Sequence, residues 1–449
     1  MLKGTMSVDG AGHLVIGGCD AVELAHRYGT PLYVLDEHLV RQRAQDYREA
    51  FGKFVPGSQV LYAGKALLTT ALCKIIAEED LGLDVVSGGE LYTALAAGFP
   101  SPRIYFHGNN KSHQELSMAL DHRIGRIVID SAWELEALQT LAASRGDIAD
   151  ILIRITPGVE PSTHSYIQTG QFDSKFGLPI NAKDTLSTIV QASKMPNLRL
   201  RGLHCHIGSQ IMGLEYFTKT VKIMVAFLAE LRASAGLVLE ELDLGGGLGI
   251  TYLDQDEPPS PGDYAKAIGD AITTSCREHD LAVPRIAVEP GRSIVGEAGV
   301  TLYTVGAIKE VSGVRKYVAI DGGMADNPRV AIYGAKYTAC LANKAAGEPI
   351  ELVTIAGKCC ESGDILIKDI MLPVVETGDI LAVCSTGAYN YSMASNYNRL
   401  PRPAMVTVWH GESDIIVQRE TYEDLIRLDR VPARLLENQP VLAGGQRGT

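Results

Sequence analysis

The chain has 449 residues and a formal net charge of −12, and 46% of its residues are hydrophobic. This length exceeds that of one small domain, so we expect a barrel-sized domain and a second, smaller one. The acidic balance argues against general binding of nucleic acid or of anionic membranes. Scattered cysteines, a start without leader-like features and no apolar run of the ~18 residues that cross a bilayer predict a soluble, cytoplasmic protein.

Strand-like pieces open the chain, at residues 13–16 and 31–35. We therefore expect residues 1–38 to join a β domain formed by the later part of the chain.

Short apolar, β-branched runs then recur, each followed by a small or polar turn and a helical segment. The first five start a little over twenty residues apart, the length of one βα unit. Eight such units predict an α/β fold with a (β/α)8 TIM barrel over residues 39–298. A doubly wound sheet has the same local pattern, but eight units in series favour the closed barrel. The runs are residues 60–63, 83–86, 103–106, 126–129, 151–155, 200–206, 239–244 and 285–288.

Helix-start signals support this reading. Apolar residues recur with helical period from Leu67 onward. Capping boxes, in which a serine and a glutamate three residues later cap each other's backbone, are predicted for Ser87 with Glu90 and for Ser131 with Glu134.

After about residue 300 the pattern changes to short apolar runs joined by glycine-rich turns. This pattern predicts an all-β domain, a sandwich or barrel, over residues 299–432. The glycine-rich end, residues 433–449, is expected to be disordered. The runs are residues 300–308, 316–320, 350–355, 380–384 and 404–409.

Reactive and phosphate-binding residue types follow the predicted barrel strands. The carboxyl ends of the strands form the active face of such a barrel. Lys65 follows the first run, and a lysine there is suited to a Schiff base with an aldehyde cofactor. The other strand-end residues are His107 with its neighbours 108–110, His206 with Ser209, the glycine run Gly245, Gly246 and Gly247, and Glu289 with Gly291 and Arg292.

The glycine run follows the seventh strand, where barrels often bind phosphate. Glycines let backbone N–H groups approach a phosphate closely, although a tight structural turn would have the same composition. Glu289 could hold a proton on a pyridine nitrogen, or simply pair with Arg292. His206 could stack on a cofactor ring, or be a core histidine. Asp84 is expected to be a buried polar group near the cofactor.

A second cluster lies in loops of the β half. It contains Arg329, Tyr333, Cys360, Glu361 and Tyr389. Arginine can hold a carboxylate through two hydrogen bonds, a glutamate can hold an ammonium group, and a thiol can transfer a proton. An amino-acid substrate would suit this set, and solvent-facing loops are the alternative.

Together these motifs resemble the fold-type III pyridoxal phosphate decarboxylases, and within them the diaminopimelate decarboxylases. The resemblance covers roughly residues 15–425, and so many motifs in one order make it specific. The matching motifs are residues 62–66, 84–91, 107–111, 174–177, 202–210, 242–247, 289–292, 360–364 and 387–389.

The resemblance implies pyridoxal 5′-phosphate as cofactor and no metal. It implies that Lys65 binds the cofactor, with Cys360 as proton donor. Cofactor contacts would come from Asp84, His206, Ser209, Gly245, Gly246, Gly247, Glu289, Gly291, Arg292 and Tyr389. Substrate contacts would come from Arg292, Arg329, Tyr333, Glu361 and Tyr389.

The resemblance also implies a homodimer in which Cys360 and Glu361 reach into the partner's barrel. The expected carboxy-lyase reaction converts meso-2,6-diaminopimelate to L-lysine and carbon dioxide, the last step of lysine biosynthesis. Glu361 suits a distal group with both amine and carboxylate, whereas ornithine-type relatives usually carry aspartate there. Gly64 and Leu67 stand where many relatives have valine and asparagine. D-lysine, D-ornithine, ornithine, arginine or carboxynorspermidine therefore remain alternative substrates, and a non-catalytic regulator is disfavoured because Lys65 and Cys360 are present.

Overall fold

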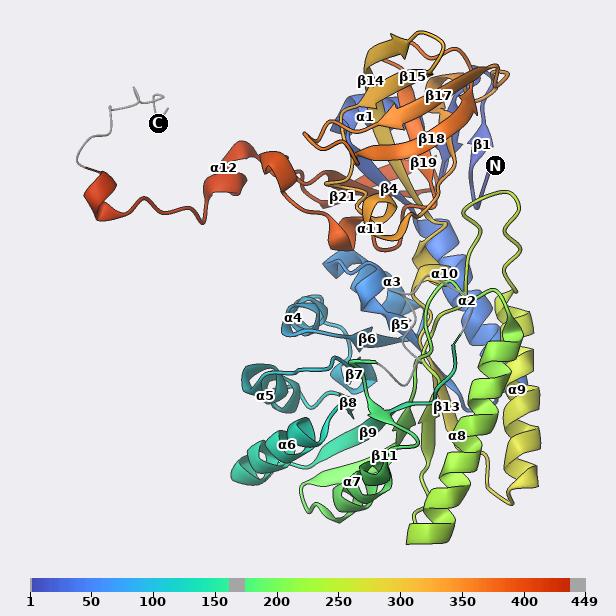
Figure 1. Cartoon of the computed structure of the whole chain (residues 1–449), viewed down its shortest axis with the longest axis vertical. Coiled ribbons are helices and arrows are strands. Elements are labelled where there is room, and N and C mark those ends of the chain that lie inside the picture. Colours follow the sequence, from blue (N-terminus) through green and yellow to red (C-terminus); the bar gives the residue numbers. More distant parts are fainter. Residues whose placement is uncertain (1, 161–173, 437–449) are drawn as a thin grey trace.

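The computed structural model describes residues 2–160 and 174–436. Most of the tail predicted to be disordered, from residue 437 onward, lies outside the described residues. Two bodies lie one above the other in Figure 1, a barrel surrounded by helices and a β-rich domain. Among the described residues, no helix combines the length and the apolar character that crossing a membrane requires.

The barrel is a ring of parallel strands, which confirms the predicted (β/α)8 fold. The ring closes because the last strand pairs with the first, β13 with β5. A short extra strand, β10 (Leu178–Pro179), pairs with β9 outside the ring. The ring strands are β5 (Gln59–Ala63), β6 (Gly82–Val85), β7 (Ile104–Phe106), β8 (Arg126–Ile129), β9 (Ala149–Thr156), β11 (Leu198–His204), β12 (Glu241–Asp243) and β13 (Arg285–Val288).

Helices cover the outside of the ring (Figure 1), so the strands are buried on both faces and read as continuous apolar runs. An additional helix, α2 (Glu37–Phe54), precedes β5 and packs against α9 and α10. The helices that follow the strands are α3 (Thr70–Glu78), α4 (Gly88–Ala96), α5 (His113–Asp121), α6 (Ala132–Arg145), α7 (Lys183–Lys194), α8 (Leu214–Ala235), α9 (Pro261–Glu278) and α10 (Arg292–Val295).

Helix starts differ in detail from the predictions. The first barrel helix begins at Thr70, because Thr69 caps it and residues Gly64–Ala66 form a 3-10 turn instead. Ser87 caps its helix as predicted, but the Glu90 carboxylate accepts from Val86 N at 2.8 Å instead of from Ser87 N. The Ser131 helix start has the same form, so neither is a full capping box.

The second body is a β domain built from both ends of the chain. Its central strand β4 pairs with β14 on one side and β20 on the other, so the N-terminal segment lies in the middle of the sheet. The elements are β1 (Ser7–Val8), β2 (Leu14–Ile16), β3 (Cys19–Asp20), α1 (Ala21–Tyr28), β4 (Leu32–Asp36), β14 (Gly299–Val311), β15 (Arg315–Ile320), α11 (Arg329–Tyr333), β16 (Ala339–Leu341), β17 (Glu351–Ala356), β18 (Ile365–Leu372), β19 (Ile380–Cys384), β20 (Ala404–Trp409), β21 (Glu412–Val417) and α12 (Tyr422–Ile426).

The two bodies are joined at the carboxyl end of β5. Tyr389 N, from the β domain, donates to Ala66 O at 2.7 Å. Ser392 Oγ donates to the same carbonyl at 2.8 Å. The turn that carries Lys65 is therefore held by residues more than three hundred positions away in the chain.

Candidate active site

A cavity of about 470 Å³ lies where the barrel's carboxyl face meets the β domain, a size ordinary for a small-molecule site. Eight residues predicted from the sequence line it together: Lys65, His206, Ser209, Glu289, Arg292, Arg329, Tyr333 and Tyr389. Lining residues that were not assigned a role are Val86, His107, Gly108, Asn109, Arg154, Phe176, His204 and Met393.

Lys65 projects from the 3-10 turn that follows β5, and its side chain is 33% exposed. Its Nζ lies 3.8 Å from Asp84 Oδ2, on the neighbouring strand β6. Burial lowers the pKa of Lys65, but the carboxylate of Asp84 and the other nearby acidic groups outweigh it, so the pKa is raised. The Lys65 amine is therefore protonated at neutral pH, and Asp84 stabilises that form.

His206 forms part of the cavity wall beside the glycine run. Gly246 N donates to His206 Nδ1 at 3.2 Å, so this ring nitrogen is the acceptor. Burial, and next the charge of Lys65, lower the pKa of His206 well below its usual value. The imidazole is consequently neutral and its orientation is fixed by the backbone of the run.

The glycine run packs closely against its surroundings. A Cβ at Gly246 would lie 2.0 Å from Glu289 O, and one at Gly291 would lie 2.9 Å from the Ala63 Cβ. Gly245 and Gly247 have φ angles of 67° and 117°, which favour glycine. None of these glycines is among the residues that line the cavity, so their predicted phosphate contact remains a prediction.

Two arginines share one phenol. Tyr252 Oη accepts from Arg292 Nη1 at 2.6 Å and from Arg329 Nη1 at 2.9 Å. Arg292 Nη2 also donates to Ser209 Oγ at 2.9 Å, and Arg329 Nη1 to Tyr337 Oη at 2.6 Å. Burial raises the pKa of Tyr252, but the two guanidinium groups outweigh it and lower it below the usual value. The phenol thus links the two cationic walls of the cavity.

Tyr389 has a φ of 63°, in the left-handed region that a tyrosine adopts at a cost. The Arg292 guanidinium lies 4.8 Å from the centre of its ring, a cation–π distance. The backbone hydrogen bond to Ala66 and this ring contact hold Tyr389 at the mouth of the cavity.

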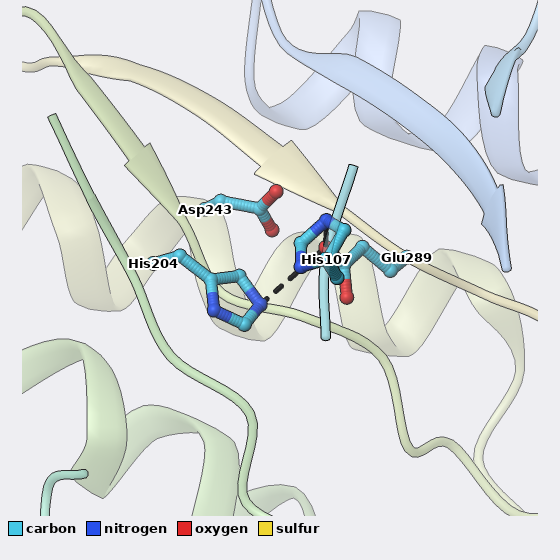
Figure 2. A group of neighbouring side chains, drawn as sticks. All are labelled: His107, His204, Asp243 and Glu289. Atoms are coloured by element: carbon cyan, nitrogen blue, oxygen red, sulfur yellow. Dashed lines mark ion pairs between the residues drawn. The ribbon is translucent and has the colours of Figure 1, made fainter. Parts of the chain in front are cut away.

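Acidic and imidazole side chains form a buried cluster in the wall of the cavity. Figure 2 shows His107, His204, Asp243 and Glu289, which point toward one another from the ends of β7, β11, β12 and β13. His107 Nε2 lies 2.8 Å and His204 Nε2 3.4 Å from Glu289 Oε1. Burial raises the pKa of Glu289, but the two imidazoles outweigh it, so its pKa is well below the usual value.

The same four side chains offer ligand atoms within 4.8 Å of one another, a spacing that a metal ion could use. Glu289, however, also lines the cavity, so the cluster is part of the cavity wall. The sequence prediction that no metal is involved remains a prediction.

Cys360 and Glu361 lie apart from this cavity. Both are exposed, in the loop between β17 and β18. Cys360 N donates to Asn398 Oδ1 at 2.6 Å, and Gly363 N donates to Glu361 Oε1 at 3.3 Å. The structure of one chain therefore does not bring them to the predicted site of the same chain.

Sequence reasoning missed several residues of the site. Arg154 lies inside strand β9 with its guanidinium 4.4 Å from the centre of the Phe176 ring. Tyr252 follows the glycine run by five positions and carries no motif of its own. His204 stands two positions before His206, and this alternation was the one available signal, since alternate residues of a strand share a face.

Comparison with known proteins extends these findings. The family model for the pyridoxal-dependent decarboxylase, pyridoxal binding domain, matches residues 37–296. The chain is 53% identical to the diaminopimelate decarboxylase of Bacillus subtilis, over 95% of this chain and 98% of the relative.

Solved structures are similar as well. Diaminopimelate decarboxylase of M. jannaschii in complex with L-lysine superposes with a TM-score of 0.90 and 38% identity, over 96% of this chain and 99% of the other. The enzyme of Helicobacter pylori, also complexed with L-lysine, gives a TM-score of 0.82 and 34% identity, over 90% and 98%.

A closed barrel with a lysine at its carboxyl face, capped by a β domain, and the match over more than half of the chain define a pyridoxal-dependent decarboxylase. Near full-length identity adds the finer assignment. The chain belongs to the diaminopimelate decarboxylase family, a family of carboxy-lyases.

Proposed function

We propose that this protein removes carbon dioxide from meso-2,6-diaminopimelate and releases L-lysine, with pyridoxal 5′-phosphate as cofactor. The observation that carries the proposal is one cavity lined by the amine of Lys65, the carboxylate of Glu289 and the Ser209–Arg292 pair. The names of the full-length relatives supply the substrate.

The donor set fits this cofactor. Pyridoxal phosphate has an aldehyde, a dianionic phosphate and a basic ring nitrogen. Lys65 would bind the aldehyde carbon, and Ser209, Arg292 and the backbone at Gly245–Gly247 and Gly291 would hold the phosphate. The ionised Glu289 would accept from the ring nitrogen. When bound, the cofactor supplies an electron sink for the carbon that loses its carboxylate.

The protein's own residues would hold the substrate and exclude water. His206 is neutral and fixed, so it can lie against the cofactor ring without adding charge. Arg329 and Tyr333, from the first and last positions of α11, would orient the substrate carboxylate with Arg292. Glu289 would keep the ring nitrogen protonated, because its own carboxylate remains ionised.

The cellular setting and the assembly belong to the same proposal. We infer a cytoplasmic homodimer in which Cys360 of one subunit donates the proton and Glu361 reads the distal end of the substrate in its partner's cavity. Supporting this, both side chains are exposed on a loop outside their own chain's cavity.

Mixed dimers test the shared site. Lys65→Ala and Cys360→Ala subunits, each inactive alone, should recover up to about a quarter of wild-type activity when subunits are exchanged at equal amounts. Separation of differently tagged heterodimers verifies the exchange. Isolated heterodimers without turnover would contradict the shared site but leave the reaction itself untouched.

The reaction is tested by carbon dioxide release from meso-diaminopimelate beside D-lysine, D-ornithine, ornithine, arginine and carboxynorspermidine. We expect turnover of meso-diaminopimelate with L-lysine as product. Lys65→Ala should abolish turnover and the cofactor's absorbance on the protein, whereas Lys74→Ala, on the exposed face of α3, should retain both. Turnover of one of the other amino acids alone would reassign the substrate, and a fully active Lys65→Ala would refute the mechanism.

A further inference from the structure

Two imidazoles, to which the sequence motifs gave no role, face Glu289 from different strands. The nitrogens His107 Nε2 and His204 Nε2 lie 2.8 and 3.4 Å from the same atom, Glu289 Oε1. The two rings meet edge to face, with centres 4.7 Å apart (Figure 2). All three residues are almost completely buried. None of these three atoms takes part in a hydrogen bond of good geometry among the described residues, so the rings face the carboxylate at contact distance, and burial shields these contacts from solvent.

The chemistry of these contacts fixes the proton positions. An ionised carboxylate only accepts hydrogen bonds, so each imidazole must present a protonated Nε2 to it. Burial lowers the pKa of His204 to about 3, which makes this ring a neutral donor. One carboxylate oxygen is thus faced by two imidazole nitrogens that could donate to it.

Other acidic and cationic side chains also surround Glu289, and Asp243 belongs to the same cluster, with a carboxylate oxygen within 4.8 Å of it. Asp84 on β6 lies 3.6 Å from His107 Nε2, and Asp243 ends β12. Burial, and next the charge of Glu289, raise the pKa of Asp243 well above its usual value. Arg154 on β9 and Lys65 are the cations that face the cluster. The two imidazoles are the groups that chiefly lower the pKa of Glu289.

We propose that His107 and His204 are a pair of positioning residues that clamp Oε1 of Glu289, keeping this carboxylate ionised and oriented toward the cofactor's ring nitrogen. The proposal rests on the proposed function, because it assigns Glu289 to that nitrogen. Their effect is exerted through Glu289 alone.

Paired substitutions at each histidine separate the loss of its N–H donor from a change in side-chain volume. His107→Leu and His204→Leu remove the donor, whereas His107→Gln and His204→Gln keep an N–H near the same place. The Leu variants should bind pyridoxal phosphate at least about ten-fold more weakly, the loss expected for a buried hydrogen bond to a charge, and the Gln variants should recover most of it. His122→Leu, at an exposed histidine that ends α5, is the matched control and should bind as the wild type does.

The pH dependence of the bound cofactor's absorbance is the decisive reading. Since the imidazoles lower the pKa of Glu289, their loss raises it, and the acidic midpoint of the titration should move toward neutral pH. The acidic limb of kcat should move in the same direction. In a Glu289→Gln background, His107→Leu should produce no further shift, because the clamped group is already neutral.

Each outcome has one meaning. Unshifted titrations and unchanged cofactor affinity in both Leu variants would overturn the clamp, while wild-type turnover leaves the proposed function standing. Equal defects in the Leu and Gln variants, or an additive effect in the Glu289→Gln background, would also overturn it, since a merely structural role predicts both. Thermal unfolding of the apoprotein shows whether each Leu variant is folded. If one is not, the Gln variants and the double-mutant cycle with Glu289→Gln test the proposal. Failure of the wild type to bind the cofactor would instead refute the proposed function.

Discussion

Lys65 and Asp84 form an ion pair at the ends of neighbouring barrel strands, with 3.8 Å between Nζ and Oδ2. Asp84 is fully buried, and within the described residues neither of its carboxylate oxygens accepts a hydrogen bond. This relationship sets the pH at which Lys65 becomes a free base.

Asp84→Asn should make Lys65 a free base at lower pH. The aspartate raises the pKa of the lysine against the effect of burial, so its removal lowers that pKa. The rate at which added pyridoxal phosphate attaches, followed by absorbance across pH, should have a midpoint displaced to lower pH. Asp80→Asn, at a largely exposed carboxylate, is the control and should leave the midpoint in place. An unmoved midpoint in Asp84→Asn would contradict the ion pair.

Tyr252→Phe should weaken substrate binding more than it slows turnover. The substitution removes the acceptor shared by Arg292 and Arg329 and leaves both guanidinium groups less constrained. Steady-state kinetics should give a KM roughly ten-fold higher, the loss of one buried charged hydrogen bond, with a smaller change in kcat. Tyr264→Phe removes a buried hydroxyl for which the described residues provide no hydrogen-bond partner, and its KM should stay at the wild-type value.

Gly246→Ala should disable cofactor binding through sterics alone. Its Cβ would lie 2.0 Å from Glu289 O, so the glycine run or the end of β13 must move. Equilibrium binding of pyridoxal phosphate should weaken by at least about ten-fold, because the displaced backbone also carries the bond to His206. Gly262→Ala, in the first turn of α9, places its Cβ 3.5 Å from Ser260 Oγ and should bind normally. Normal cofactor binding by Gly246→Ala would contradict this prediction, because it would show that the glycine run can shift to accommodate the Cβ without weakening the site.

Glu90→Gln should stabilise the apoprotein selectively at alkaline pH. Burial raises the pKa of Glu90 to about 7, above its unfolded value, so the native state binds more protons between the two values. Stability from this group is present below the unfolded pKa and is lost as pH rises through about 7. The advantage of Gln over Glu should grow by about 1–2 kcal/mol from acidic to mildly alkaline conditions, measured by urea unfolding. Glu136→Gln, at an exposed position of α6, should show no such trend.

The sequence predicted the cavity where residue type and strand position agreed. Lys65, His206, Glu289 and Arg292 each follow an apolar run, and closure of the barrel brings the ends of such runs to one face. His107 was noticed in the same way but received no role. Its partner Glu289 is distant in the chain, and a contact between two strand ends has no local signature.

Other parts of the site lay beyond sequence patterns. Arg154 is inside a buried strand, where an arginine is unexpected and no turn marks it. In the β domain, β18 and β21 were not predicted because their half-exposed faces carry charged residues such as Lys368 and Glu412. Cys360 and Glu361 are exposed on a loop outside their own chain's cavity, so the fold of one chain does not bring them to the site that the motifs indicated.

The backbone bond from Tyr389 to Ala66 has a consequence for how the molecule can be divided. Residues 37–296 contain the reactive amine of Lys65, but Tyr389, whose backbone N–H fixes the turn that carries it, lies far downstream in the chain. A barrel expressed alone would keep Lys65 but lose the hydrogen bond from Tyr389 that fixes the lysine's turn. The barrel and the β domain therefore depend on each other at the active site, although they look like separate modules. They must be expressed and engineered as one unit.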